Sequence, residues 1–424
     1  MKKITIIALL LLSVLLLLSA CSTEEQAGQV NEEYEGDTVE DITSLEEIGD
    51  INGDDSAADI DEMTVDIDDN EDEISSTERL YYSPFTGKIV NEYYLRKALV
   101  VIVENSPAAR PQSGLAEASI VYEVMAEGGI TRFLALYWDE IPEKIGPVRS
   151  ARPYMIEIAR EYNAVLLHAG GSPGAYAMLA ENKIDYIDQI YNGQYYWRSN
   201  DRKAPHNLYT GNIRIQRYLD RILGQEYEDR FRFQQVSFIK ADDEKSDYIN
   251  LPLWAGTTVI YKYNSQENQY YRYYGFMETP HLMDNNRQIT AKNIIIQFAK
   301  TRQIDDVGRL EVDLEGRGQA LLFRDGIVVE GSWEKDTDNL TKYYNCTGQP
   351  MILNPGQTWI EVIPDTIKVE YYSQEAENRD SNEIEDDLIG IDPAITEDIE
   401  DKVEDIDSDS LEDNSKNELY QEIL

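Results

Sequence analysis

Acidic residues are concentrated in two long flanks of this 424-residue chain. Residues 22–78 contain 23 Asp or Glu and no Lys or Arg, and residues 375–424 contain 20 acidic and 3 basic residues. Segments with so much charge of one sign and so few aromatic side chains cannot bury enough apolar surface to fold alone. We therefore predict a disordered acidic stalk over 22–78 and a disordered acidic tail over 375–424. The folded part is expected within residues 79–374, which carry 38 acidic and 33 basic side chains.

The charge balance also limits the possible partners. The whole chain has a formal net charge of −43, and residues 79–374 still have a net charge of −5. Neither the flanks nor the central part has the excess of Lys and Arg that phosphate backbones require. We therefore expect no nucleic-acid partner.

The N-terminal residues are typical of a lipoprotein signal peptide. Two lysines precede a largely apolar run over residues 4–20, and Cys21 follows the small residues at its end. A membrane-spanning helix needs roughly 20 apolar residues, and this run is shorter. We predict that residues 1–21 are the signal peptide and that Cys21 becomes the first mature residue, carrying acyl chains such as palmitate. The chain would then be lipid-anchored to the cell membrane on its extracytoplasmic face.

Residues 79–240 predict a mixed α/β module. Four β-rich apolar runs predict strands at residues 98–103, 118–125, 130–138 and 164–167. Helices are expected at 151–162, with Ser150 as the capping residue, and at 175–182, with Ser172 as the cap. Strands that alternate with helices around glycine-rich turns favour a mixed α/β arrangement.

Residues 245–370 predict a second module that is rich in β-structure. Its short β-rich runs recur about every ten residues, at 257–263, 269–274, 294–298, 310–314, 319–324, 327–333, 351–353 and 358–362. This spacing favours an antiparallel sandwich or barrel. The expected fold class is therefore α+β or α/β, with a mixed N-terminal module and a mainly antiparallel β C-terminal module. If Cys21 carries lipid, only Cys346 remains, so the core must be stable without an internal disulfide.

Three arginines form the strongest candidate for a ligand site. Arg132 follows a Gly-Gly turn, and Arg149 and Arg152 lie at the start of the first predicted helix. Residues three apart lie on one side of a helix, and helix N-termini favour anions. Guanidinium groups bind phosphate and carboxylate through paired N–H donors. The pattern predicts an anion-binding site.

Other residues of this predicted site lie in two further turns. They are Arg202, His206, Asn207, Gly170, Gly171 and Ser172. A structural interpretation stays open beside the functional one, in which the arginines form ion pairs with nearby acids. The acids considered are Glu123, Glu127 and Asp139.

Whether the chain is an enzyme is left open by its sequence. In a catalytic interpretation, Glu123 or Glu127 would act as base or metal ligand, and His206 or His168 as acid or base. Residues 170–174 also match the pattern G-x-S-x-G of a serine nucleophile. However, Pro173 follows the serine and has no N–H for an oxyanion hole, which argues against a serine hydrolase.

No metal or cofactor is predicted. The three histidines are His168, His206 and His281, and they have neither the spacing of a histidine pair nor a cysteine pair beside them. A divalent metal that joins histidines from separate loops is conceivable, but no pattern supports it.

Several short sequence motifs of the chain occur together in a known family. They are residues 83–87, 110–115, 122–132, 146–152, 168–172, 204–208, 331–333 and 355–360. In this order they resemble the YerB-like lipoproteins of Gram-positive bacteria, which have paired N- and C-terminal domains of unknown function. The resemblance covers roughly residues 80–365. It implies an envelope lipoprotein with two modules and does not supply a reaction.

These observations lead to three functional hypotheses. The first is an extracytoplasmic lipoprotein that binds or scaffolds an anionic envelope ligand, such as a wall polymer, through its Arg and His residues. The second is an envelope enzyme acting on a phosphate- or pyrophosphate-linked polymer or lipid carrier. The third is an adaptor that binds protein partners through its acidic tails.

Overall fold

A computed structural model describes the central part of the chain. The described residues are 80–90, 95–181, 183–237, 239–254, 257–337 and 340–374. The predicted signal peptide with Cys21, the acidic stalk and the acidic tail all lie outside these residues. Within the described ranges, no helix has the length and apolar character needed to cross a membrane.

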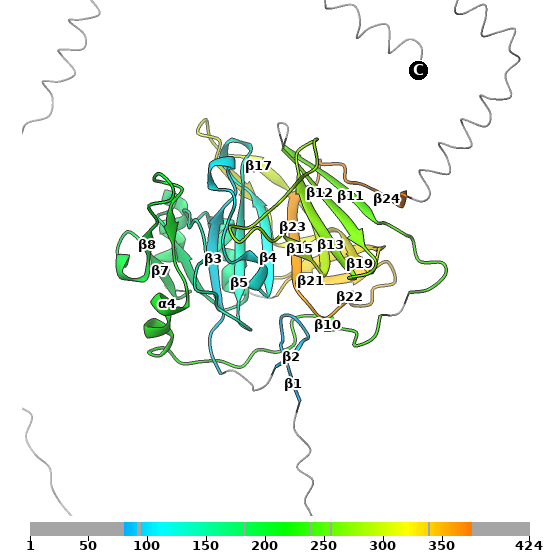
Figure 1. Ribbon diagram of the computed structural model, residues 1–424, viewed down its shortest axis with the longest axis horizontal. Coiled ribbons are helices and arrows are strands. Elements are labelled where there is room, and N and C mark those ends of the chain that lie inside the picture. Colours follow the sequence, from blue (N-terminus) through cyan, green and yellow to red (C-terminus); the bar gives the residue numbers. More distant parts are fainter. Residues whose placement is uncertain are drawn as a thin grey trace, which may run out of the picture. The chain divides into compact units, whose positions relative to one another are not determined.

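Ten of the described strands form one sheet that draws on both halves of the chain (Figure 1). In order across the sheet they are β21 (Lys342–Asn345), β20 (Ile327–Lys335), β19 (Gly316–Arg324), β16 (Asn293–Ala299), β23 (Thr358–Pro364), β4 (Ile120–Met125), β5 (Thr131–Tyr137), β3 (Leu99–Glu104), β6 (Val165–His168) and β7 (Tyr186–Asp188). β4 and β5 form the antiparallel hairpin expected from the sequence. β23 pairs with β4 in parallel, with Ile360 beside Tyr122, and this pairing joins the two halves.

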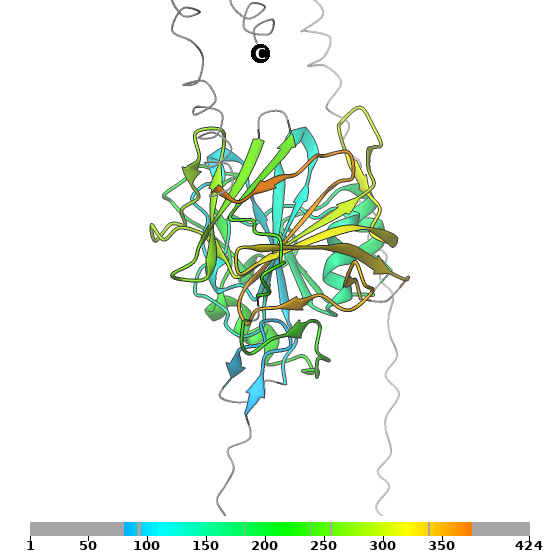
Figure 2. The same cartoon turned by 90° about the vertical axis from the view of Figure 1, so that its right-hand side faces the viewer.

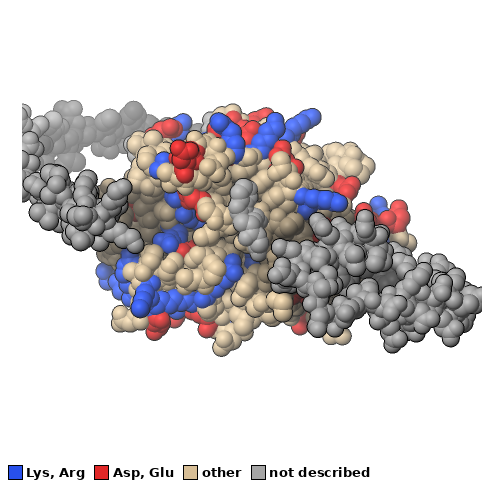
Figure 3. All heavy atoms as spheres, turned by 90° about the horizontal axis from the view of Figure 1, so that it is seen from above, with Lys and Arg blue, Asp and Glu red and all other residues tan. Residues whose placement is uncertain are grey.

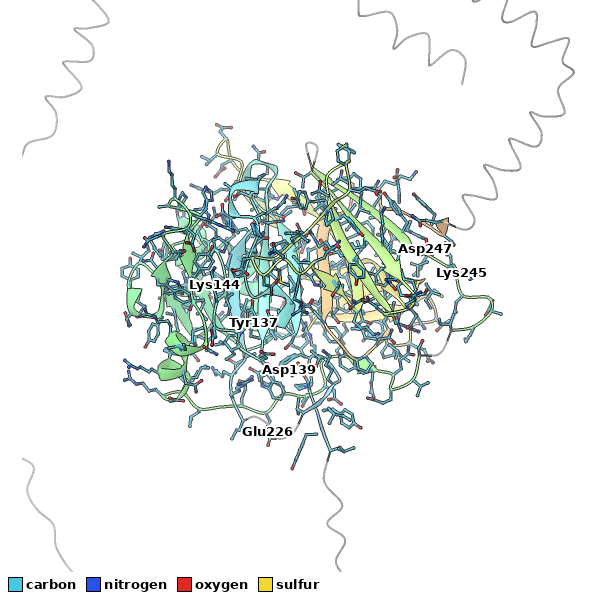
Figure 4. The ribbon with its side chains drawn as sticks, viewed as in Figure 1. Tyr137, Asp139, Lys144, Glu226, Lys245 and Asp247 are labelled. Atoms are coloured by element: carbon cyan, nitrogen blue, oxygen red, sulfur yellow. The ribbon has the colours of Figure 1, made fainter. Side chains whose placement is uncertain are left out.

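The C-terminal half adds a second sheet of six strands. In order they are β14 (Thr279–Pro280), β13 (Gln269–Tyr274), β12 (Thr257–Asn264), β11 (Tyr248–Trp254) and β24 (Glu370–Tyr372), with β15 (Thr290–Ala291) also paired to β13. All of these pairs are antiparallel. Lys245 and Asp247 lead into β11 beside β24 (Figure 4), and the Asp247 N–H donates to the Tyr372 carbonyl at 3.1 Å.

Both faces of the ten-stranded sheet are covered. Successive residues of a strand point to opposite faces. In β3, Val100 and Ile102 share a core with residues of α2 (Pro153–Glu161) and α3 (Pro173–Leu179), whereas Val101 and Val103 share a core with β11 and β12. Figure 2 shows the helical layer and the second strand layer on opposite sides of the sheet. Burial on both faces explains why the central strands are continuous apolar runs.

Shorter elements complete the fold. α4 spans Asn212–Leu219, and 3-10 turns lie at η1 (Pro107–Ala109), η2 (Leu115–Glu117), η3 (Glu127–Gly129) and η4 (Gly193–Tyr195). The two-stranded pairs are β1 (Tyr81–Tyr82) with β2 (Ile89–Val90), β8 (Trp197–Arg198) with β9 (Leu208–Tyr209), β10 (Arg232–Phe233) with β22 (Ile352–Leu353), and β17 (Thr301–Gln303) with β18 (Leu310–Val312).

The two predicted helix caps have different outcomes. Ser172 caps α3 as expected, because its Oγ accepts a hydrogen bond from the Ala175 N–H at 3.2 Å. The prediction that Ser150 caps the first helix is wrong. α2 begins at Pro153 after an extended Arg152, and the residue before it, Ala151, instead donates its N–H to the Gly170 carbonyl at 2.9 Å. The backbone at Ala151 stays extended because it forms a β-bridge with Gly171 of the neighbouring loop.

The predicted fold class is confirmed in part. The described residues contain far more strand than helix, and a mixed arrangement does occur where β3, β6 and β7 run parallel beside α2 and α3. Most of the described strand pairs within the C-terminal half are antiparallel, as expected for a mainly antiparallel module, and the exception is β16, which runs parallel to β23. The predicted module boundary near 240–245 stays a prediction, since strands from both sides of it share one sheet.

Candidate functional site

The parallel strands β3, β6 and β7 place their last residues along one edge of the sheet. These residues are Glu104, His168 and Asp188. The carboxyl edge of parallel strands is where α/β sheets usually bind ligands, because the loops there converge. The sequence-predicted Arg149 also lies at this edge, since its N–H donates to the carbonyl of Ile102 in β3 at 2.9 Å.

Glu104 holds two functional side chains in place. Its carboxylate accepts a hydrogen bond from Arg149 Nη2 at 2.8 Å and lies 2.9 Å from His206 Nδ1, while Ser106 Oγ donates at 2.7 Å. Burial alone would raise the pKa of Glu104, but the hydrogen bonds from Arg149, Ser106 and His206 outweigh it and lower that pKa. Glu104 is therefore a fixed negative charge at neutral pH.

Arg149 and His206 keep donors and acceptors available to a ligand. The Glu104 side chain is only 5% exposed, whereas the Arg149 and His206 side chains are 29% and 26% exposed. Among the described residues, Arg149 uses one of its five N–H donors, and His206 Nε2 has no hydrogen-bond partner. The carboxylate thus orients a guanidinium and an imidazole whose other edges face solvent.

A second charged cluster lies beside the first. Glu127 binds Arg152 through both carboxylate oxygens, one contact being 2.8 Å, and lies 3.4 Å from Arg132 Nη2. Arg132 also donates to the Ser150 carbonyl at 2.9 Å. Burial and the charge of Arg152 lower the pKa of Arg132 to about 10, and the charge of Arg149 contributes to the same shift. The charges of the two clusters are therefore close enough to interact electrostatically.

The predicted glycine-rich loop, residues 170–172, contacts the segment that carries Arg149 and Arg152. Gly171 forms a bridge with Ala151, and the Ser172 N–H donates to the Ala151 carbonyl at 3.3 Å. Gly170 has a φ of +72°, which a side chain would oppose, and its N–H donates to Asp188 at 2.8 Å. Gly170, Gly171 and Ser172 thus lie next to the site, and their described hydrogen bonds are with the protein itself.

His168 lies under this loop and not in an open cleft. It is fully buried, with Nδ1 2.9 Å from the Gly170 carbonyl and Nε2 without a partner among the described residues. Burial lowers the pKa of His168, whereas the hydrogen bond to the Gly170 carbonyl and the charge of Asp188 act in the opposite direction. His168 and His206 therefore do not present their rings to a common opening.

Arg202 and Asn207 hold the loop that carries His206. The Arg202 guanidinium donates to the carbonyls of Ala109 and Pro111, which lie beyond the end of β3. Asn207 Nδ2 donates to the Ser199 carbonyl at 2.8 Å. The structure gives both residues a supporting position next to the site.

Glu123 lies behind the site in a buried polar network. Its carboxylate is bound by Arg272 and by Asn105 Nδ2, the latter at 3.0 Å. Because Glu123 is 1% exposed, a ligand at the surface of the site does not reach it. Asp139, the other acid considered as an arginine partner, accepts instead from Thr86 Oγ1 at 2.8 Å.

Glu104 was missed by reasoning from the sequence. The ion pairs considered there used acids in the following hairpin, and only the one with Glu127 is observed. A signal was present, since Glu104 is the first charged residue after the apolar run at 98–103 and therefore ends a buried strand. Figure 3 shows that basic and acidic side chains are interspersed on the visible part of one face, so charge alone does not mark the site.

Comparisons with known proteins agree with this architecture. Residues 85–224 match the N-terminal domain of a protein of unknown function (DUF3048), and residues 249–360 match the C-terminal domain of the same family. The relative named "Putative lipoprotein YerB" from Bacillus subtilis strain 168 is 33% identical over 303 residues, which cover 69% of this chain and 89% of the relative. Its name agrees with the lipoprotein prediction.

A solved structure supports the same assignment. The crystal structure of YerB protein from Bacillus subtilis matches with a TM-score of 0.61 and 32% identity, over 68% of this chain and 99% of that chain. Both family domains, the relative and the solved structure therefore lead to one conclusion. The chain belongs to the DUF3048 family and is related to the YerB protein of Bacillus subtilis.

Proposed function

We propose that this protein is a lipoprotein, anchored to the membrane through Cys21, that binds an anionic ligand of the cell envelope with Arg149 and His206. The observation that carries the proposal is the buried Glu104 carboxylate, which orients both side chains while their remaining polar atoms stay exposed. Among the described residues, Arg149 leaves four of its five N–H donors unused, and its side chain is 29% exposed, so a ligand can reach them.

The local charge favours an anion. The two adjoining clusters contain three guanidinium groups and two carboxylates, and so have one net positive charge before His206 is counted. His206 Nε2 donates to an anion in the imidazolium form, in which both ring nitrogens carry hydrogen and the net charge rises by one. A guanidinium binds phosphate and carboxylate oxygens through parallel hydrogen bonds. The proposed ligands are a phosphate-bearing wall polymer, the pyrophosphate of a lipid carrier or a carboxylate of peptidoglycan. Arg132 and Arg152 would add attraction at longer range.

One observation also favours an enzymatic role at the same site. A carboxylate on one imidazole nitrogen and an exposed second nitrogen is the arrangement of a general base or acid. Here Glu104 holds His206 Nδ1 and leaves Nε2 facing out. The candidate reaction is transfer or hydrolysis at a phosphate group, with Arg149 stabilising developing charge.

A ligand-induced stability screen tests the proposal. The mature chain without lipid would be titrated with inorganic phosphate, pyrophosphate, teichoic-acid fragments and soluble peptidoglycan fragments, and its thermal unfolding followed. A ligand at about 100 times its Kd adds about 2.7 kcal/mol to the free energy of unfolding. We expect Arg149→Gln and His206→Asn to lose this gain, and Arg302→Gln, which removes an exposed arginine paired with Glu311, to keep it.

Each outcome of the screen has a defined meaning. Stabilisation by an anion that persists in Arg149→Gln would place the ligand elsewhere and refute the site. The absence of stabilisation by any of these anions would refute the binding proposal. Release of phosphate from a bound ligand, lost in His206→Asn, would establish the enzymatic role over simple binding.

A further inference from the structure

Large apolar side chains are exposed at the end of the domain where the described chain begins. In Figure 1, the β1–β2 hairpin lies at the bottom of the described part and α4 lies at its lower left. The exposed apolar residues on these segments and their neighbours are Leu80, Tyr82, Ile89, Leu95, Ile213 and Leu223. Ile213 is 76% and Leu223 is 89% exposed, although such side chains favour burial. We refer to the surface formed by these six residues and α4 as the anchor-side face.

Arginines lie among the apolar residues of this face. Arg214, Arg217 and Arg221 are exposed and line one shallow hollow of about 380 Å³ together with Ile213 and Tyr195. Within the described ranges, none of the three arginines forms an ion pair with an acid. α4 is held from beneath by the fully buried Ile215, so its arginine side is presented to solvent on a fixed helix.

The α4 segment is packed against the start of the N-terminal half. A Cβ atom placed on Gly224 would lie 1.8 Å from the Leu95 carbonyl oxygen, so the two backbones are in close contact. Leu95 and Leu223 are therefore neighbouring exposed leucines. The described chain begins at Leu80 on this face, and the predicted anchor, Cys21, precedes it in the sequence.

We propose that the anchor-side face rests on a bilayer of anionic phospholipid. Exposed leucine and isoleucine side chains beside arginines are the pattern of surfaces that lie in the lipid interface, with the apolar groups inserted and the guanidinium groups on phosphates. The acyl chains on Cys21 would keep the protein at the membrane, and this second contact would fix how the domain is oriented. Acidic residues also occur at this end, including Glu226 (Figure 4), so the apolar contacts are needed as well as the arginines.

This orientation would direct the candidate ligand site toward the cell wall. β3 begins at Leu99, four residues after Leu95, and ends at Glu104. A strand of six residues extends about 20 Å. Glu104, Arg149 and His206 would therefore lie roughly that far from the lipid surface, on the side from which a wall polymer approaches. The membrane contact does not depend on the proposed anion site, because the two use different residues.

Vesicle flotation tests the proposal. Residues 22–424, which lack the anchor, would be mixed with vesicles of phosphatidylcholine alone or of phosphatidylcholine and phosphatidylglycerol. We expect binding to the anionic vesicles. Each arginine near the surface is worth about five-fold in affinity, so the triple variant Arg214→Gln, Arg217→Gln, Arg221→Gln should bind roughly a hundred-fold more weakly.

Matched variants test whether binding depends on this particular face or on any exposed arginines and apolar side chains. The charge control replaces three exposed arginines elsewhere, Arg287, Arg302 and Arg317, by Gln and should bind as the wild type does. The double variant Ile213→Ser, Leu223→Ser should reduce binding, whereas Met277→Ser with Val307→Ser should not.

Three results would overturn the proposal. The first is a wild-type chain that does not float with anionic vesicles, and the second is equal loss of binding in the charge control. The third is a dimer, detected by analytical ultracentrifugation, that the double variant Ile213→Ser, Leu223→Ser converts to a monomer while vesicles bind neither protein. That result would make the face a contact between copies of the chain.

Discussion

Replacement of Glu361 by Gln should stabilise the protein in a way that depends on pH. Glu361 is fully buried on β23 beside Glu123 of β4, and its Oε1 accepts the Tyr261 hydroxyl at 2.6 Å. Burial raises the pKa of Glu361 well above 4.5, and the charge of Glu123 raises it further, against the charge of Arg272. Glu361 is therefore protonated in the folded protein over a pH range in which it is ionised in the unfolded chain.

The size of the effect follows from this difference in protonation. Above pH 4.5 the unfolded chain releases a proton that the folded protein retains, so the wild-type free energy of unfolding falls by about 1.4 kcal/mol per pH unit until the folded pKa is reached. Gln keeps an acceptor for Tyr261 and places a donor at the position of Oε2, which has no partner among the described residues. With no proton to retain, Glu361→Gln should become more stable relative to the wild type by about 1.4 kcal/mol for each pH unit between 4.5 and the raised folded pKa of Glu361.

Urea denaturation at several pH values measures this gain. The free energies of unfolding of wild type and Glu361→Gln should be similar near pH 4.5 and diverge as the pH rises. Glu311→Gln, at an exposed carboxyl that pairs with Arg302, serves as the control and should track the wild type to within about 1 kcal/mol. A constant difference between Glu361→Gln and wild type across this range would show that Glu361 is ionised in the folded protein and refute the reasoning.

Two further substitutions test other parts of the structure. Arg272→Met should lower the free energy of unfolding by about 3–5 kcal/mol in urea denaturation, because it leaves the buried Glu123 carboxylate without its cation. Adding Glu123→Leu should restore much of that loss, and a loss under about 1 kcal/mol in the single variant would argue against a charged pair. Ser172→Ala should cost about 1 kcal/mol in the same assay, because it removes the cap of α3, and an unchanged stability would mean that this cap is replaced by solvent.

Local patterns predict much of the N-terminal half. The apolar runs at 98–103 and 118–125 become β3 and β4, and the glycine turn before Thr131 forms the expected hairpin. These features depend on neighbouring residues, so a single sequence contains the necessary information. The pairing of β23 with β4 joins residues about 240 apart in the chain, and no local pattern specifies it. The parallel pairing of β23 with β4 was missed for that reason.

The candidate site divides in a similar way. Residue chemistry predicts that Arg149, Arg152 and His206 belong to a ligand site, and the structure brings them to neighbouring positions. Residue chemistry does not predict that Glu104 binds both Arg149 and His206, because these contacts depend on where three separate loops converge. His168 seemed a comparable candidate from its sequence, and burial under the 170–172 loop is visible only in three dimensions.

The parallel pairing of β23 with β4 has a consequence for the order in which the protein is made. β4 ends at Met125, whereas β23 begins at Thr358, about 230 residues later. At synthesis rates of about 5–20 residues per second, β4 waits roughly 10–50 s for its neighbour. During that interval one edge of a largely apolar strand is open to pairing with other chains. The newly made N-terminal half is thus a natural client for chaperones, and a truncated gene product lacking β23 would keep that edge open permanently.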